Sequence, residues 1–133
     1  MKTSGCDGCA AGSLSVETLT TGGFIEFTPS AGYRLYAGLG NPQAAPGSID
    51  IAYSFSFWPG GGWDIRERNV YRGEGTFAPG DRFRVAVENG TVKYFKNGTL
   101  VYISTIAPTA PMTFNVSLLT LGASLANAVL QIP

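Results

Sequence analysis

Two Asn-Gly dipeptides constrain the fold of this chain more than any other feature. Asn89-Gly90 and Asn97-Gly98 separate stretches in which apolar and polar residues alternate, as in Phe83-Arg84-Val85. Asn-Gly is the strongest short signal for a two-residue hairpin, because a type I′ turn needs positive φ at both central positions. The sequence therefore predicts a three-stranded antiparallel meander over residues 83–88, 92–96 and 99–104.

The remaining sequence has the same character. Its 18 glycines and 8 prolines separate short stretches with apolar residues at period two, and helical spacing is missing. Further strands are expected at 13–19, 24–29, 33–39, 49–57, 63–68, 70–76, 112–119 and 123–132. In 49–57, Ile51, Tyr53 and Phe55 should face the core, and Ser54 and Ser56 a side that is open or lightly covered.

Ten or eleven short strands without a significant helix predict an all-β fold. At 133 residues the chain is expected to be one domain, residues 1–133, made of two packed antiparallel sheets as in a β-sandwich or jelly roll.

Composition excludes several functions. Nine basic and nine acidic residues are scattered along the chain, so no basic field is available for nucleic acid or an anionic membrane. No apolar stretch has the length of a signal-peptide core or a membrane-spanning helix, so neither a signal peptide nor membrane insertion is expected in this sequence. The low charge suits a subunit that packs against neighbours.

The chain has no histidine, which excludes Ser/His/Asp and Cys/His nucleophile systems. A structural zinc site needs four Cys or His ligands and one chain offers two, so no metal site is predicted within it. Asp7, Asp50, Asp64 and Asp81 are too dispersed for a calcium loop, and no cofactor is expected.

The aromatic segment 57–75 is the best binding candidate. Trp58 and Trp63 flank a Pro-Gly-Gly-Gly turn and are expected to lie near one another at a hairpin tip. Indoles beside hydrogen-bonding groups form a platform on which a sugar ring can stack. The alternative is a cross-strand Trp pair that closes the sandwich edge or forms a subunit contact. The other candidate ligand-binding residues are Arg66, Arg68, Tyr71, Arg72 and Glu74 on the following strands, and Arg34 and Tyr36, which share one face of an earlier strand.

The segments "GDRFRVAVENGTVKYFKNGTLVYIST" and "MTFNVSLLTLGASLANAVL" resemble the C-terminal half of the concanavalin A-like lectin/glucanase superfold, which includes laminin G-like and SPRY modules. With "CDGC" first and "VYRG" in mid-chain, the sequence is similar to lectin-like modules of bacterial extracellular multidomain proteins. The resemblance implies a place outside the cell or on its surface in a parent protein. It leaves open a rim calcium, as in some laminin G-like modules.

Two departures from the family matter. Such modules place a strand before the cysteine pair, and here almost nothing precedes it, which predicts an open sheet edge. Glucanases of this superfold carry Glu-x-Asp-x-x-Glu on one strand. Asp64 and Glu67 match its second half, but Gly62 stands at the first carboxylate position, so the retaining pair is missing.

Cys6 and Cys9 in "GCDGC" admit three interpretations: a redox centre, half of a metal site, or a disulfide. A thioredoxin-type pair needs a strand before it and a helix behind it, and neither is predicted. Asp7-Gly8 is a turn dipeptide that would bring the sulfurs together. In an oxidising compartment we expect a disulfide in an N-terminal turn segment, residues 1–12, beside the open edge.

Three functions follow in order. The first is a non-catalytic lectin-like module that binds a polysaccharide or cell-surface glycan. The second is a structural subunit that assembles through its open strand edge into a fibre, shell or oligomer. The third is a glycoside hydrolase.

Overall fold

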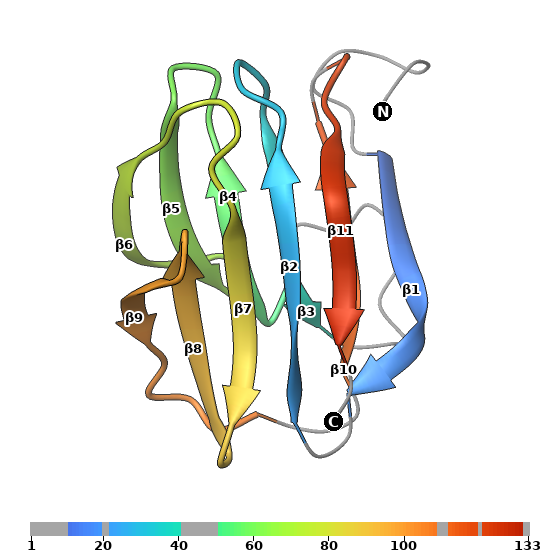
Figure 1. Ribbon diagram of the computed structural model, residues 1–133, viewed down its shortest axis with the longest axis vertical. Coiled ribbons are helices and arrows are strands. Elements are labelled where there is room, and N and C mark those ends of the chain that lie inside the picture. The colour runs from blue at the N-terminus through green and yellow to red at the C-terminus, as the bar shows by residue number, and fades with distance from the viewer. Residues whose placement is uncertain (1–10, 20–21, 41–50, 109–111, 120, 132–133) are drawn as a thin grey trace.

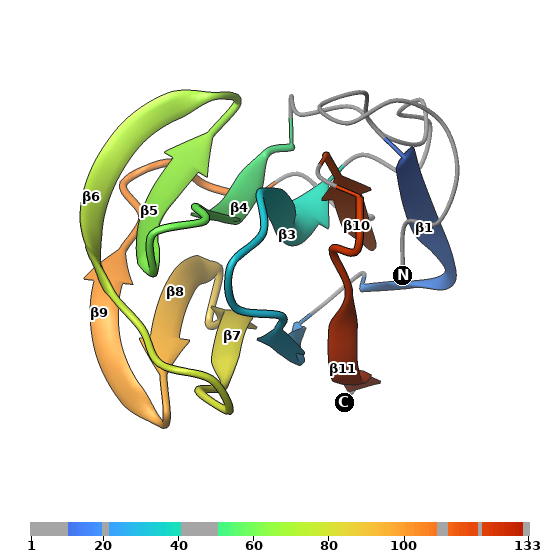
Figure 2. The ribbon, with the colours of Figure 1, turned by 90° about the horizontal axis from the view of Figure 1, so that it is seen from above.

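Eleven antiparallel strands form two sheets that pack face to face (Figures 1 and 2). The computed structural model describes residues 11–19, 22–40, 51–108, 112–119 and 121–131, with only the backbone described for 11–19. None of these residues lies in a helix, so this part of the chain has no helix that could span a membrane. The all-β sandwich prediction is confirmed.

The first sheet has six strands in the order β1-β10-β3-β4-β5-β6, and the second has five in the order β11-β2-β7-β8-β9. The strands are β1 (Ala11–Leu19), β2 (Gly23–Pro29), β3 (Leu35–Gly40), β4 (Tyr53–Phe57), β5 (Gly62–Glu67), β6 (Val70–Thr76), β7 (Phe83–Glu88), β8 (Thr91–Lys96), β9 (Thr99–Ile103), β10 (Met112–Leu118) and β11 (Leu125–Gln131). Figure 2 shows the two sheets as layers, with β6 and β9 together at one side.

The predicted meander is confirmed as β7, β8 and β9. Asn89 and Gly90 have φ values of 51° and 73°, and Asn97 and Gly98 have 51° and 83°, as a type I′ turn requires. A third turn of this kind joins β5 to β6, where Arg68 and Asn69 have φ values of 50° and 64°. Its Arg-Asn sequence did not signal a hairpin.

Aromatic rings fill the space between the sheets. Phe27 and Phe83 come from the five-stranded sheet, Phe55 and Phe57 from the six-stranded one, and all four are fully buried. Phe57 and Phe83 meet edge to face with centroids 4.8 Å apart, a favoured geometry for aromatic pairs. These rings define the inner faces, and the alternation of the strands then assigns every neighbouring side chain to an outer face.

The outer face of β4 is more deeply covered than the sequence suggested. Ser54 and Ser56 are fully buried, although this side was expected to be open or lightly covered. The Ser54 hydroxyl donates to the carbonyl of Arg66, and Ser56 accepts a hydrogen bond from Arg34. The reason is that long side chains from the neighbouring strands lie across these serines.

The N-terminal predictions fall largely outside the described residues. β1 begins at Ala11, two residues before the predicted start at Ser13. Cys6 and Cys9 lie in the part of the chain that is not described, so the disulfide stays a prediction.

Candidate functional site

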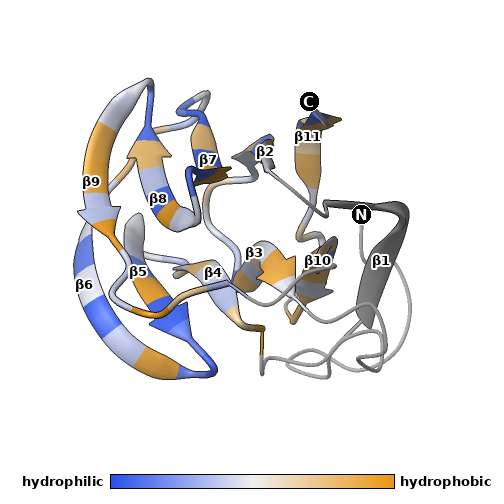
Figure 3. Ribbon diagram, turned by 90° about the horizontal axis from the view of Figure 1, so that it is seen from below, coloured by the Kyte–Doolittle hydropathy of each residue, from blue (hydrophilic) through white to orange (hydrophobic). Residues whose placement is uncertain are grey.

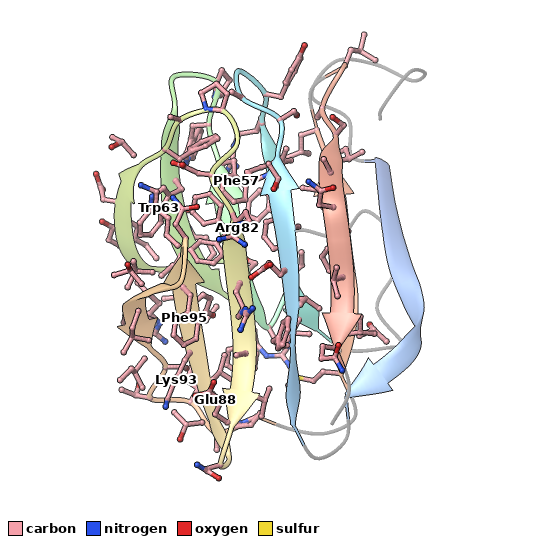
Figure 4. All side chains as sticks on the ribbon, viewed as in Figure 1. Phe57, Trp63, Arg82, Glu88, Lys93 and Phe95 are labelled. Atoms are coloured by element: carbon pink, nitrogen blue, oxygen red, sulfur yellow. The ribbon has the colours of Figure 1, made fainter. Side chains whose placement is uncertain are left out.

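Trp58 and Trp63 lie on opposite faces of the six-stranded sheet. Phe57 and Trp63 are cross-strand partners, so both point inward (Figure 4), and Trp58, one residue further along, points outward. Trp63 is 7% exposed and packs edge to face against Phe55 at 5.5 Å. The prediction that the two indoles share a surface is therefore wrong, because the register of the β4–β5 hairpin separates them.

A row of side chains crosses the outer face instead. We call it the outer row; its members are Arg34, Tyr36, Trp58, Asp64, Arg66, Tyr71 and Glu74. Six of them were predicted as ligand-binding residues, and Asp64 was considered only as a catalytic group. Each member contacts the next, so the row is one connected network across β3, β4, β5 and β6.

Trp58 forms the exposed centre of the outer row. Its side chain is 41% exposed, and the Arg34 guanidinium carbon lies 3.6 Å from the centroid of its ring. The indole Nε1 donates to Oδ2 of Asp64 at 3.2 Å. A cation beneath one face and a hydrogen bond at one edge fix the orientation of the indole, and such a cation–π contact contributes about 0.5–1 kcal/mol at an exposed site.

Arg34 supports Trp58 from below. Its Nη1 donates to the carbonyl of Phe57 at 3.1 Å, and its Nη2 donates to the Tyr36 hydroxyl at 2.8 Å. Burial lowers the pKa of the Arg34 guanidinium, while Tyr36 acts in the opposite direction. The guanidinium nevertheless stays charged, because an arginine in a protein does not lose its proton.

Asp64 and Arg66 form a two-point ion pair in the middle of the row. Nε and Nη2 of Arg66 donate to Oδ1 and Oδ2 of Asp64 at 3.2 and 3.0 Å. This hydrogen bonding raises the pKa of Arg66. Arg66 uses Nε and Nη2 on Asp64, so its Nη1 donors are available to a ligand.

Tyr71 and Glu74 complete the row on β6. The Tyr71 hydroxyl donates to Oε1 of Glu74 at 2.8 Å, and this bond is the main cause of the raised pKa of Tyr71. Arg66 lies over the Tyr71 ring at 5.5 Å. Tyr71 is 48% exposed and Glu74 is also exposed, so both are accessible from solvent.

Two predicted ligand-binding residues lie elsewhere. Arg68 is an exposed residue of the β5–β6 turn, at the other end of β5 from Trp58. Arg72 lies beside Glu67, with its Nε 3.3 Å from Oε1 of that carboxylate. The cause is a β-bulge: Ile65 pairs with Gly73 but Arg66 pairs with Tyr71, so Arg72 is the extra residue and its side chain turns away from Arg66.

Asp64 and Glu67 do not form a carboxylate pair. Asp64 belongs to the outer face of β5, whereas Glu67 is buried between the sheets and accepts a hydrogen bond from Tyr94 at 3.0 Å. Two carboxylates on opposite faces of a sheet cannot act on one glycosidic bond. Among the described residues, no group of three or more acidic or Cys side chains is placed to hold a metal ion.

Sequence reasoning missed the role of Asp64, although a signal was present. Asp64 and Arg66 alternate with the apolar Trp63 and Ile65, and this period of two alone assigns them to the outer face. The pair had been judged only against a catalytic motif.

The sequence matches no protein-family model and no curated protein. Solved structures share the architecture. The carbohydrate-binding module CBM66 from Bacillus subtilis aligns over 95% of this chain and 83% of its own, with 14% identity and a TM-score of 0.61. A β-glucanase of Bacillus licheniformis aligns over 92% and 71%, with 14% identity and a TM-score of 0.60. The SPRY domain of human HERC1 aligns over 90% and 80%, with 12% identity and a TM-score of 0.57. The chain therefore has the concanavalin A-like lectin/glucanase fold, as its resemblance implied.

Proposed function

We propose that this protein is a non-catalytic carbohydrate-binding module whose ligand lies on the outer row. The observation that carries the proposal is Trp58, an exposed indole fixed by Arg34 and Asp64. A flat aromatic surface of this kind stacks against the C–H face of a sugar ring, while neighbouring donors and acceptors bind its hydroxyls. The same fold is found in a protein described as a carbohydrate-binding module, which supports the proposal at the level of fold.

The residues of the outer row favour binding over catalysis. Asp64 is 6% exposed, and both of its oxygens accept hydrogen bonds from Trp58 or Arg66. Its role is to hold the side chains that reach the ligand. A retaining glycosidase needs two accessible carboxyl groups about 5–5.5 Å apart, and a carboxylate engaged in this way is a poor nucleophile.

A glycan array and pull-downs with insoluble polysaccharides test the proposal. We expect a glycan that binds the intact protein and binds Trp58→Ala at least about tenfold more weakly, a loss of about 1.4 kcal/mol. Phe95→Ala is the matched control, because Phe95 is a partly exposed aromatic residue of the other sheet (Figure 4). The proposal fails if no glycan binds in either assay, or if Trp58→Ala binds as well as the intact protein.

A second candidate function, self-assembly through a strand edge, is supported by β9. This edge strand carries no charged residue, and Leu100, Val101 and Ile103 are 45%, 36% and 47% exposed (Figure 3). Edge strands usually carry charges or proline that prevent pairing. An antiparallel pair of β9 strands from two copies would place no like charges opposite each other.

Light scattering of Ile103→Lys tests self-assembly. If β9 pairs between copies, the particle mass of the intact protein should exceed that of the chain, and a charge on the edge should reduce it. Val129→Lys on β11, the other edge of the same sheet, is the control, since Val129 is 46% exposed. A monomeric intact protein would exclude this function and leave carbohydrate binding unaffected.

We place the module outside the cell in its parent protein, where polysaccharides and surface glycans are found. The proposed Cys6–Cys9 disulfide belongs to the same hypothesis, because disulfides persist in oxidising compartments. The intact mass of the secreted protein before and after reduction would reveal the bond. A reduced pair in that material would contradict the disulfide without affecting the outer row.

A further inference from the structure

The charges of the outer face balance, and this bears on the kind of ligand it can take. Among the described side chains on this face, the charged ones are Arg34, Asp64, Arg66 and Glu74, two of each sign. Arg66 is neutralised by Asp64 through two hydrogen bonds. Arg34 lies beneath the Trp58 ring, where it bonds to Ser56 and Tyr36. Neither arginine presents an unbalanced positive charge to solvent.

Glu74 is the charged group of the outer row that reaches solvent most fully. It is exposed, and its printed partner is the neutral hydroxyl of Tyr71 rather than a cation. An anionic ligand near Tyr71 would meet this carboxylate at short range, and like charges in contact cost binding energy. An uncharged polyol would instead donate hydroxyl hydrogens to Glu74 and accept hydrogen bonds from Arg66.

The row also holds two separate aromatic platforms. Trp58 lies at the β4–β5 hairpin and Tyr71 on β6, with the Asp64–Arg66 pair between them. The backbones of β4 and β6 are two strand spacings apart, about 10 Å. One face of Trp58 is covered by Arg34, so a ligand has only the opposite face to stack on. A ligand that uses both platforms must extend across the strands.

We propose that the ligand is an uncharged oligosaccharide that lies across β4, β5 and β6, with one sugar on Trp58 and another beside Tyr71 and Glu74. This proposal rests on the proposed function. It adds the charge of the ligand, its direction on the sheet and the need for more than one sugar unit.

Calorimetric titrations at low and high ionic strength test the charge of the ligand. The probes are neutral tetrasaccharides of glucose, galactose, mannose and fructose, and tetrasaccharides of galacturonic and mannuronic acid. We expect at least one neutral probe to bind with an affinity that changes less than about twofold with salt, because no charged contact is screened. The uronic acid probes should bind at least about tenfold more weakly.

Glu74→Gln sharpens the test of charge. Removing the carboxylate should reduce the discrimination against uronic acids while the neutral probe still binds. Glu88→Gln is the control, because Glu88 is an exposed glutamate of the other sheet (Figure 4) and lies 3.1 Å from Lys93. The inference is overturned if the uronic acids bind as tightly as the neutral probes and weaken with salt. If no probe of either kind binds, the proposed function itself fails.

Ligand length tests the two platforms. The neutral tetrasaccharide should bind more tightly than the corresponding disaccharide, and Tyr71→Ala should remove that gain while affecting the disaccharide little. Trp58→Ala should weaken both. Equal affinities for the two lengths in the intact protein would contradict a ligand that spans the row and would leave stacking on Trp58 intact.

Discussion

The two faces of strand β5 carry nearly the same chemical groups in opposite settings. Each face has a carboxylate, an arginine and a tyrosine that contact one another, together with a tryptophan nearby. The outer set is Asp64, Arg66, Tyr71 and Trp58, and the inner set is Glu67, Arg72, Tyr94 and Trp63. The residue types alone therefore do not separate a ligand surface from a structural cluster.

Burial separates the two sets. In the inner set, the side chain of Glu67 is 0% exposed, and Tyr94 is fully enclosed between the sheets. In the outer set, Trp58 and Tyr71 are 41% and 48% exposed. We therefore expect substitutions in the inner set to reduce folding stability, and substitutions in the outer set to reduce ligand binding.

The largest contrast should come from the two tryptophans. Trp63→Ala should lower the free energy of unfolding by about 3–5 kcal/mol, because it leaves a cavity beside Phe55 and Phe83. Trp58→Ala should change it by no more than about 1 kcal/mol, the contribution of an exposed cation–π contact. Urea denaturation measures both values. Equal losses would show that the two indoles do not differ in role.

The inner carboxylate should come next. Glu67→Ala leaves the Tyr94 hydroxyl and the Arg72 guanidinium without their partner, and should cost about 2–3 kcal/mol of stability. The figure is below that for a fully buried pair because the Arg72 side chain is 31% exposed. Glu67→Gln keeps an acceptor for Tyr94 and should cost less. A loss under about 0.5 kcal/mol in Glu67→Ala would mean that the buried pair is structurally dispensable.

Two glycines of β6 test the packing of Trp63 against its neighbouring strand. A Cβ atom on Gly75 would lie 2.6 Å from the Trp63 ring, whereas one on Gly73 would have no atom within 4 Å. Gly75→Ala should therefore destabilise by about 1–3 kcal/mol through overpacking. Gly73→Ala should be neutral or slightly stabilising. Thermal unfolding of the two variants would compare them, and equal behaviour would contradict the close contact.

Alkaline titration should reveal the smallest difference. Burial, followed by Glu67, raises the pKa of Tyr94 well above 10.0, whereas the hydrogen bond to Glu74 is the first cause for Tyr71. A raised folded pKa favours the neutral phenol in the folded state. The stability contributed by Tyr94 is therefore complete below the unfolded pKa near 10 and is lost as the pH rises above it.

Tyrosinate absorbance and urea denaturation at alkaline pH measure the two effects. Glu74→Gln should lower the titration midpoint of one exposed tyrosine and leave stability unchanged. Glu67→Gln should make the alkaline loss of stability shallower. A Glu74→Gln variant with an unchanged tyrosine titration would contradict the Tyr71–Glu74 hydrogen bond.

Local rules in the sequence predicted most of the fold. The Asn-Gly turns gave the meander of β7, β8 and β9 because type I′ geometry depends on two consecutive residues. Period-two alternation placed Tyr53, Phe55 and Phe57 in the core, and it placed Arg34 and Tyr36 on one outer face. Each of these features depends on neighbours in the chain, so a single sequence contains it.

The composition of the candidate site depended on pairing between strands. The β4–β5 register put Phe57 opposite Trp63, which sent Trp63 into the core and left Trp58 outside. The bulge in β6 put Tyr71 opposite Arg66 and turned Arg72 toward Glu67, so two arginines that simple alternation would have placed side by side are separated. The sequence by itself determined which strands form and which residue types they carry. The tertiary structure decided which of two similar sets faces solvent, because a one-residue change in register moves a side chain to the opposite face of a sheet.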